Sequence, residues 1–218
     1  YFSALICKYK AAMSTFRYGI LPFAAILLLI VGLLVLEPHF SAAIIIIAIG
    51  GVMLFLGGVK LRWFIGVGVG ALAALGVIIT FFPYASGRIS TWLDPFANTS
   101  GNGYQIVQSL YAIGSGGLFG LGLGQGRQKY LYLPEEHNDF IFPVVCEELG
   151  FVGAIAILIL FALLVVRGYW LALHMRDRYS FLVTAGITTL LAIQVFLNVA
   201  VVTNLVPCAG ISLPFFSY

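Results

Sequence analysis

The residues that could do chemistry gather in one stretch of an otherwise apolar chain. This stretch, residues 88–148, holds six of the eight acidic residues of the protein. A solvated loop whose charges only keep it out of lipid would have the same composition, so the order of the residues must decide between the two interpretations. The charged and imidazole side chains of the stretch are Arg88, Asp94, Arg127, Lys129, Glu135, Glu136, His137, Asp139, Glu147 and Glu148.

Asp139 differs from the other acidic residues in its neighbours. The segment Tyr130–Pro143 places a polar group between aromatic and apolar flanks of the kind found at a membrane interface. Since Asp139 runs directly into Phe140-Ile-Phe142, we expect its carboxylate at the top of a cavity, partly withdrawn from water. Such a carboxylate can act as a general base or bind a divalent cation, Mg²⁺ or Mn²⁺. The sequence leaves both roles open.

Basic residues near Asp139 predict an anionic substrate. Arg127 and Lys129 are close to it in sequence and could meet an anionic headgroup, notably phosphate. Lys129 also fits an interfacial lysine that only extends its amine toward water. We predict further help in substrate binding from Glu136, His137 and Asp94.

The composition defines the setting of these residues. Of the 218 residues, 61% are hydrophobic and 9% are charged, whereas soluble domains carry about 45–50% apolar and about 25% charged residues. This excludes a water-soluble single domain. The formal net charge of +3 is small and scattered, which argues against binding of nucleic acid. We therefore predict an all-α fold, a polytopic transmembrane helical bundle.

Five membrane spans are predicted from charge-free runs of about 20 residues, the length that a helix needs to cross a bilayer. They are Tyr18–Leu36, Phe40–Val59, Trp63–Pro83, Leu149–Val166 and a run from Tyr179 to about Val206.

Basic residues orient these spans. With five alternating spans, eight basic residues fall on one side, which is therefore predicted to be the cytoplasm. The long loop at residues 83–143 falls on the outer side. The eight residues are Lys8, Lys10, Arg17, Lys60, Arg62, Arg167, Arg176 and Arg178.

A sixth span over Pro95–Gly126 is the main rival to this map. This stretch is uncharged, but it is rich in glycine, which weakens a helix by about 1 kcal/mol per residue relative to alanine. A crossing here would also break the charge rule. We therefore predict that Gly103–Gly126 is a re-entrant or interfacial element of the outer loop, helical at Tyr104–Ile113.

Several motifs of the loop and of the end of the chain occur together in the order and spacing of one known family. They are Ser90–Phe96, Gly103–Ser109, Ile113–Gly117, Gln128–Glu135, His137–Phe142, Glu147–Gly150, Val202–Pro207 and Gly210–Tyr218. In these motifs the chain resembles the SEDS proteins, the shape, elongation, division and sporulation family of FtsW, RodA and SpoVE. The resemblance covers nearly the whole chain.

The resemblance implies a fold and an activity. Members have ten transmembrane helices, so residues 1–218 would be a fragment of a single SEDS domain that runs from the end of the fourth helix through the ninth. Members polymerise peptidoglycan glycan strands from lipid II, an undecaprenyl diphosphate-linked disaccharide peptide. The essential acid of the family loop matches Asp139, and the family's Gln-Lys pair matches Lys129.

The resemblance also implies partners and a place. Family members work with a class B penicillin-binding protein and with other membrane proteins of the divisome or elongasome. We therefore expect a multi-pass protein of the bacterial cytoplasmic membrane, with its site on the outer face. Two other functions stay open: a lipid II flippase and a non-catalytic scaffold for the penicillin-binding protein. A flippase would need functional charges within its helices, and the first, second and fourth predicted spans contain none.

Overall fold

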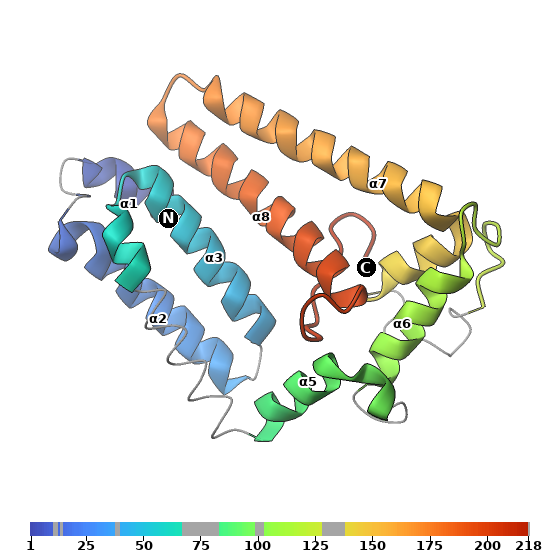
Figure 1. Cartoon of the computed structure of the whole chain (residues 1–218). Helices are drawn as coiled ribbons and strands as arrows, with labels where there is room; N and C mark the ends of the chain where they lie inside the picture. Colours follow the sequence, from blue (N-terminus) through green and yellow to red (C-terminus); the bar gives the residue numbers. More distant parts are fainter. Residues whose placement is uncertain are drawn as a thin grey trace. The chain divides into compact units, whose positions relative to one another are not determined.

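The computed structural model describes residues 1–10, 13, 15–37, 40–66, 83–98, 103–127 and 138–217. Within these ranges the chain forms helices and connecting segments without a β-strand, which confirms the all-α prediction. The chain divides into two compact units, which are described separately (Figure 1). Unit 1 comprises Tyr1–Gly76 and Leu164–Ile193, and unit 2 comprises Val77–Leu163 and Gln194–Tyr218.

Two helices of the described ranges are long and apolar enough to cross a membrane. They are α7 (Ile141–Leu173) and α8 (Arg178–Val202), and each contributes one part to each unit. Helix α7 extends beyond the predicted span Leu149–Val166 at both ends. The prediction stopped at charged residues, whereas the helix continues through them because their charged groups have partners. Arg167, for example, places its guanidinium 4.1 Å from the ring centre of Trp170.

Unit 1 contains the first predicted spans. The π-helix η2 (Phe16–Ile20) leads into α2 (Leu21–Leu36), which packs against α3 (Phe40–Gly57), while the short α1 (Phe2–Lys8) contacts α3. Helices α2 and α3 are apolar around their whole circumference, as expected for helices in a bilayer. Residues 61–66 are helical, and the rest of the third predicted span lies almost entirely outside the described residues.

Polar bonds at the start of α8 tie the parts of unit 1 together. Arg178 Nη2 donates to the carbonyl of Gly57, at the end of α3, over 3.0 Å. The hydroxyls of Tyr169 and Thr189 are 2.9 Å apart and connect the last turns of α7 to α8. The core of the unit is made by Ile6, Met13, Ile20, Phe23, Met53, Leu54, Val59 and Leu182.

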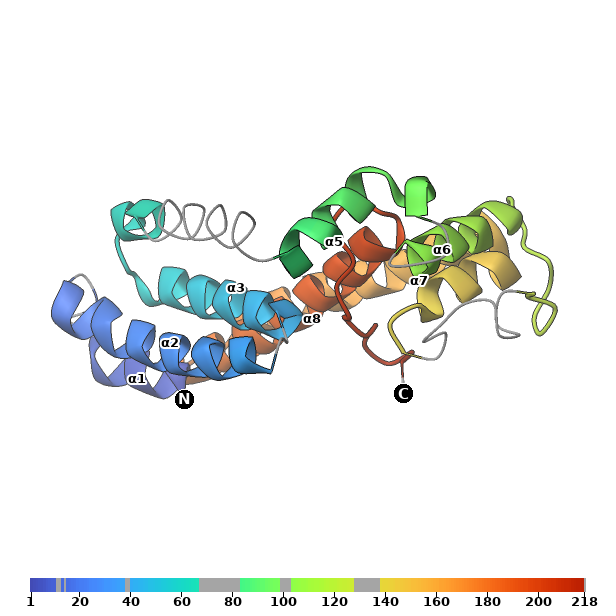
Figure 2. The same ribbon diagram turned by 90° about the horizontal axis from the view of Figure 1, so that it is seen from below.

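Unit 2 contains the long loop predicted at residues 83–143, and most of its described part is helical. Helix α5 (Pro83–Leu93), the 3₁₀-helix η3 (Pro95–Asn98) and α6 (Tyr104–Ser115) follow one another. Helix α6 lies within the predicted re-entrant element and nearly matches its predicted helix. Both views show α6 beside the first turns of α7 and α5 beside the end of α8 (Figures 1 and 2).

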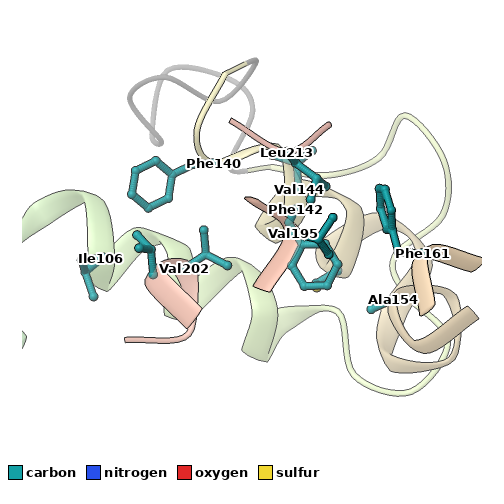
Figure 3. Packing of buried hydrophobic residues seen from close by; sticks show 11 residues of the cluster. Ile106, Phe140, Phe142, Val144, Ala154, Phe161, Val195, Val202 and Leu213 are labelled. Atoms are coloured by element: carbon teal, nitrogen blue, oxygen red, sulfur yellow. The ribbon is translucent and has the colours of Figure 1, made fainter. Parts of the chain in front are cut away.

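Phe140, the residue that follows Asp139, belongs to the hydrophobic core of unit 2. Phe140 is 2% exposed and lies in one cluster with Ile106 of α6 and Val202 of α8 (Figure 3). The same cluster includes Phe142 and Leu213, so the first turn of α7 and the segment after α8 share this core. The apolar flank of Asp139 is thus fixed by packing against three other parts of the unit.

Candidate active site

The carboxylate of Asp139 lies in the turn at residues 138–140, directly before α7. It is partly buried, as its apolar flank predicts. The segment that follows α8 lies close to it. A Cβ atom built on Gly210 would lie 2.8 Å from Asp139 Oδ2, so the carboxylate and the Gly210 backbone are in close contact.

Main-chain bonds fix the position of Asp139. Asn198 of α8 is 1% exposed, and its Nδ2 donates to the carbonyls of Asp139 and Ile211 over 2.8 Å and 2.6 Å. Ser217 Oγ donates to the carbonyl of Asn138 over 2.5 Å. Because these bonds join α8, the turn before α7 and residues 211–217, they fix the main chain that carries the carboxylate.

Arg88 brings a positive charge to the same place from α5. Its Nη1 donates to the carbonyl of Cys208 over 2.6 Å, two residues before Gly210. Burial raises the pKa of the Cys208 thiol; the charge of Arg88 opposes this rise and the charge of Asp139 adds to it. Both charges act on the Cys208 thiol, so the Arg88 guanidinium and the Asp139 carboxylate both lie close to it.

Helix α5 is itself anchored beside the segment after α8. Trp92 Nε1 donates to the carbonyl of Asn204, and Asn204 Nδ2 donates to the carbonyl of Trp92, both over 3.1 Å. This reciprocal pair lies one helical turn from Arg88. The position of the guanidinium is therefore set by three hydrogen bonds between α5 and residues 204–208.

A second structural feature of unit 2 is a break in α7. Gly150 has a φ of 69°, a conformation that residues with a Cβ atom rarely adopt. At this break a glycine-rich loop, residues 116–127, bonds to backbone groups that an unbroken helix would pair with each other. Four N–H groups donate to carbonyls across the contact: Phe151 to Gly117 (2.9 Å), Val152 to Leu118 (3.1 Å), Leu121 to Glu147 (3.0 Å) and Gly122 to Glu148 (3.1 Å).

The two glutamate side chains before the break also hold the glycine-rich loop. Glu147 Oε1 accepts the backbone N–H of Arg127 over 2.9 Å, and Glu148 Oε2 accepts that of Gly124 over 3.0 Å. Glu147 lies eight residues after Asp139, or roughly 12 Å at the rise of an α-helix. Arg127, whose side chain is exposed, is therefore anchored at this distance along α7 and not directly beside Asp139.

The remaining predicted site residues divide into two groups. Asp94 is exposed, and its Oδ1 accepts the N–H of Ala97 over 3.1 Å, so it caps η3. Lys129, Glu136 and His137 lie outside the described residues, and their roles stay predictions.

The described ranges contain no group of three His, Cys, Asp or Glu side chains that could hold a metal ion. The described charge near Asp139 is the cation Arg88, which disfavours a second positive charge at the same place. The described residues alone therefore do not form a site for the predicted divalent cation.

Sequence reasoning did not find the residues that surround Asp139. Arg88 was recognised only as a charge of the outer loop, and Asn198 and Gly210 were not considered as site residues at all. The one sequence signal for Asn198 is that it is an amide within an apolar helix, where a buried polar side chain needs hydrogen-bond partners.

Comparisons with known proteins agree with this architecture. The chain is 42% identical over 206 residues to stage V sporulation protein E of Bacillus subtilis, covering 94% of the chain and 56% of that protein. It is 40% identical over 218 residues to a probable peptidoglycan glycosyltransferase FtsW of Trichlorobacter lovleyi, covering 100% and 57%. The chain thus spans somewhat more than half the length of these relatives.

Solved structures give the same result. A peptidoglycan synthase complex contains a chain that matches with a TM-score of 0.76 at 30% identity, over 100% of this chain and 62% of that one. The rod shape determining protein RodA of Thermus thermophilus matches with a TM-score of 0.58 at 28% identity, over 99% and 56%. The family model for the cell cycle proteins FtsW, RodA and SpoVE matches residues 1–218. The chain belongs to this family.

Proposed function

We propose that the protein is a peptidoglycan glycosyltransferase that polymerises glycan strands from lipid II, for cell division or cell shape. The observation that carries the proposal is the setting of Asp139: its carboxylate is partly buried, its main-chain carbonyl accepts a hydrogen bond from the Asn198 side chain, and the cation Arg88 is nearby. Relatives named probable peptidoglycan glycosyltransferase, at about 40% identity over the whole chain, support the same reaction.

The reaction makes two demands on the protein: a base for the hydroxyl proton and positive charge for the diphosphate. A sugar hydroxyl attacks the anomeric carbon of a lipid-linked disaccharide; its O–H bond breaks, a glycosidic C–O bond forms, and the bond to the diphosphate breaks. Asp139 accepts the hydroxyl proton as general base. Positive charge stabilises the departing diphosphate, and Arg88, Arg127 and Lys129 are the basic residues proposed for this task.

Partners and location are proposed on the same basis. We propose that the protein lies in the bacterial cytoplasmic membrane, with Asp139 at the outer face, and works with a class B penicillin-binding protein. The match to a chain of a peptidoglycan synthase complex supports such a partner. A divalent cation, Mg²⁺ or Mn²⁺, would be an alternative source of the positive charge for the diphosphate, and Asp139 would then be its ligand.

The described helices favour catalysis over transport of lipid II. Helices α2 and α3 contain no charged residue. Helix α7 contains the buried Glu147, but its carboxylate accepts a bond from the backbone of the glycine-rich loop. This gives the buried charge a role in holding the loop, which a transport path does not require.

The test uses the full-length protein purified with its penicillin-binding partner and supplied with labelled lipid II. Asp139→Asn should abolish polymer, because an amide cannot accept the hydroxyl proton. Asp177→Asn is the matched control: Asp177 is exposed and caps α8 in unit 1, and asparagine caps a helix equally well. The control should retain polymer.

Two results would contradict the proposal. Undiminished polymer from Asp139→Asn would remove the general base. No polymer from the wild-type complex, together with lipid II crossing vesicle bilayers, would favour the flippase.

A further inference from the structure

Glu147 and Glu148, the two adjacent glutamates before the break in α7, bind the glycine-rich loop, and the chemistry at Asp139 does not explain this role. Both direct their carboxylates at backbone N–H groups of the glycine-rich loop, Glu147 at Arg127 and Glu148 at Gly124. Their backbone carbonyls accept two more N–H groups of the same loop. Side chains and main chain therefore attach the loop to α7 at a single level of the helix.

Glu147 is the more buried of the two, with 1% of its surface exposed. A buried carboxylate is costly unless hydrogen bonds compensate for the lost water. A bond between a carboxylate and a backbone N–H is charge-assisted and is stronger than a neutral one. This bond ends at the backbone of Arg127, so Glu147 fixes the main chain of the residue that carries the guanidinium.

We infer that Glu147 is a positioning residue for substrate: by holding the Arg127 backbone, it places the Arg127 guanidinium to bind the diphosphate of the lipid-linked substrate. The inference deepens the proposed function and rests on it. Arg127 is exposed and anchored roughly 12 Å along α7 from Asp139. A diphosphate group and an extended arginine side chain together can bridge a gap of this size, so the sugar could reach Asp139 while the diphosphate contacts Arg127.

Hydrogen exchange tests the anchoring independently of activity. In the full-length protein with its partner, Glu147→Ala should speed exchange at the Arg127 amide by about tenfold or more, since it removes a charge-assisted hydrogen bond. Peptides from α8 should keep their wild-type rates. Glu147→Gln should stay close to wild type, because the amide oxygen can still accept the N–H. Glu37→Ala, which removes an exposed carboxylate of unit 1, is the matched control.

Should Glu147→Ala fail to fold, Glu147→Asp keeps the charge but withdraws the carboxylate by one methylene. It should give the same local change in exchange. Exchange at Arg127 equal to wild type in the folded variant would overturn the inference.

Kinetics with lipid II test the role in substrate binding. Glu147→Ala should lower kcat/KM for lipid II by about tenfold and leave the pH profile of kcat unchanged, because Arg127 binds the diphosphate and takes no part in proton transfer. Arg127→Ala should lower kcat/KM to a similar extent, and the double variant should be no worse than Arg127→Ala alone. An unchanged kcat/KM, or additive effects, would overturn the inference. Failure of the proposed function would appear instead as full activity of Asp139→Asn, with the exchange result unaffected.

Discussion

Gly210→Ala is the substitution that tests most directly whether the carboxylate of Asp139 must stay where the structure places it. The new methyl carbon would lie 2.8 Å from Asp139 Oδ2, whereas ordinary contact begins at 3.4 Å, so the carboxylate must retreat by about 0.6 Å. A displacement of about 1 Å at a reacting group can cost ~10²-fold in rate. We therefore expect kcat to fall about tenfold or more.

The same substitution should leave the fold nearly intact. Gly210 does not have a positive φ, and the atom that the methyl group meets is the end of a side chain that can rotate. We expect the free energy of unfolding to change by less than about 1 kcal/mol. Gly87→Ala is the matched control, because a methyl group at this position of α5 would have nothing within 4 Å.

The assay compares polymer formation from labelled lipid II with thermal unfolding for both variants. Loss of rate in Gly210→Ala with an unchanged melting temperature, and full activity in Gly87→Ala, is the expected result. Full activity in Gly210→Ala would refute the reasoning, since it would mean that the reaction tolerates a displaced carboxylate. Equal losses in both variants would refute it as well.

Two further predictions concern stability. Asn198→Ala should lower the free energy of unfolding by about 2–4 kcal/mol in denaturant titrations, because it leaves the buried carbonyls of Asp139 and Ile211 without their donor; a change below about 1 kcal/mol would contradict this. Asp177→Ala should lower the melting temperature more at pH 7 than at pH 3. The Ser180 N–H that bonds to the carboxylate lowers the pKa of Asp177, so its stabilisation is present above about pH 4, the unfolded value, and fades as the pH falls through the still lower folded value. An equal loss at both pH values would contradict this.

Helices could be predicted from the sequence wherever one local pattern decided the structure. The uncharged run at Phe40–Val59 predicted α3, and the polar helix at Tyr104–Ile113 predicted α6, each within two residues at both ends. The start of α7 was harder to predict. In the sequence, Glu147 and Glu148 mark the boundary before the predicted span Leu149–Val166. The sequence does not show that N–H groups of the glycine-rich loop satisfy both carboxylates, so that the helix can include them.

The break at Gly150 was unpredictable for a similar reason. A single glycine in an apolar helix is usually tolerated, and its meaning depends on the glycine-rich loop that bonds to both sides of it. The two segments lie about 30 residues apart, and the four bonds on either side of Gly150 join backbone groups only, which no side-chain pattern reveals.

Asp139 itself was predictable because its flanks are local, whereas its surroundings are not. Asn198 follows 59 residues later, and Arg88 bonds to the carbonyl of Cys208, 120 residues further along the chain. A pattern search relates neighbours in sequence, and neither residue is a neighbour. The partly buried position of Asp139 could thus be predicted from one segment, but the charge of Arg88 near it could not.

Asp139→Asn is an informative variant because it changes the carboxylate and leaves the backbone contacts of residue 139 in place. Asn198 holds the main-chain carbonyl of residue 139, which the substitution leaves in place. Phe140, packed in the core beside it, is also unchanged. The hydrogen bond to the backbone should therefore persist when the carboxylate becomes an amide. A loss of polymer without a loss of stability would then show that the proton acceptor is missing, and not that the protein is misfolded.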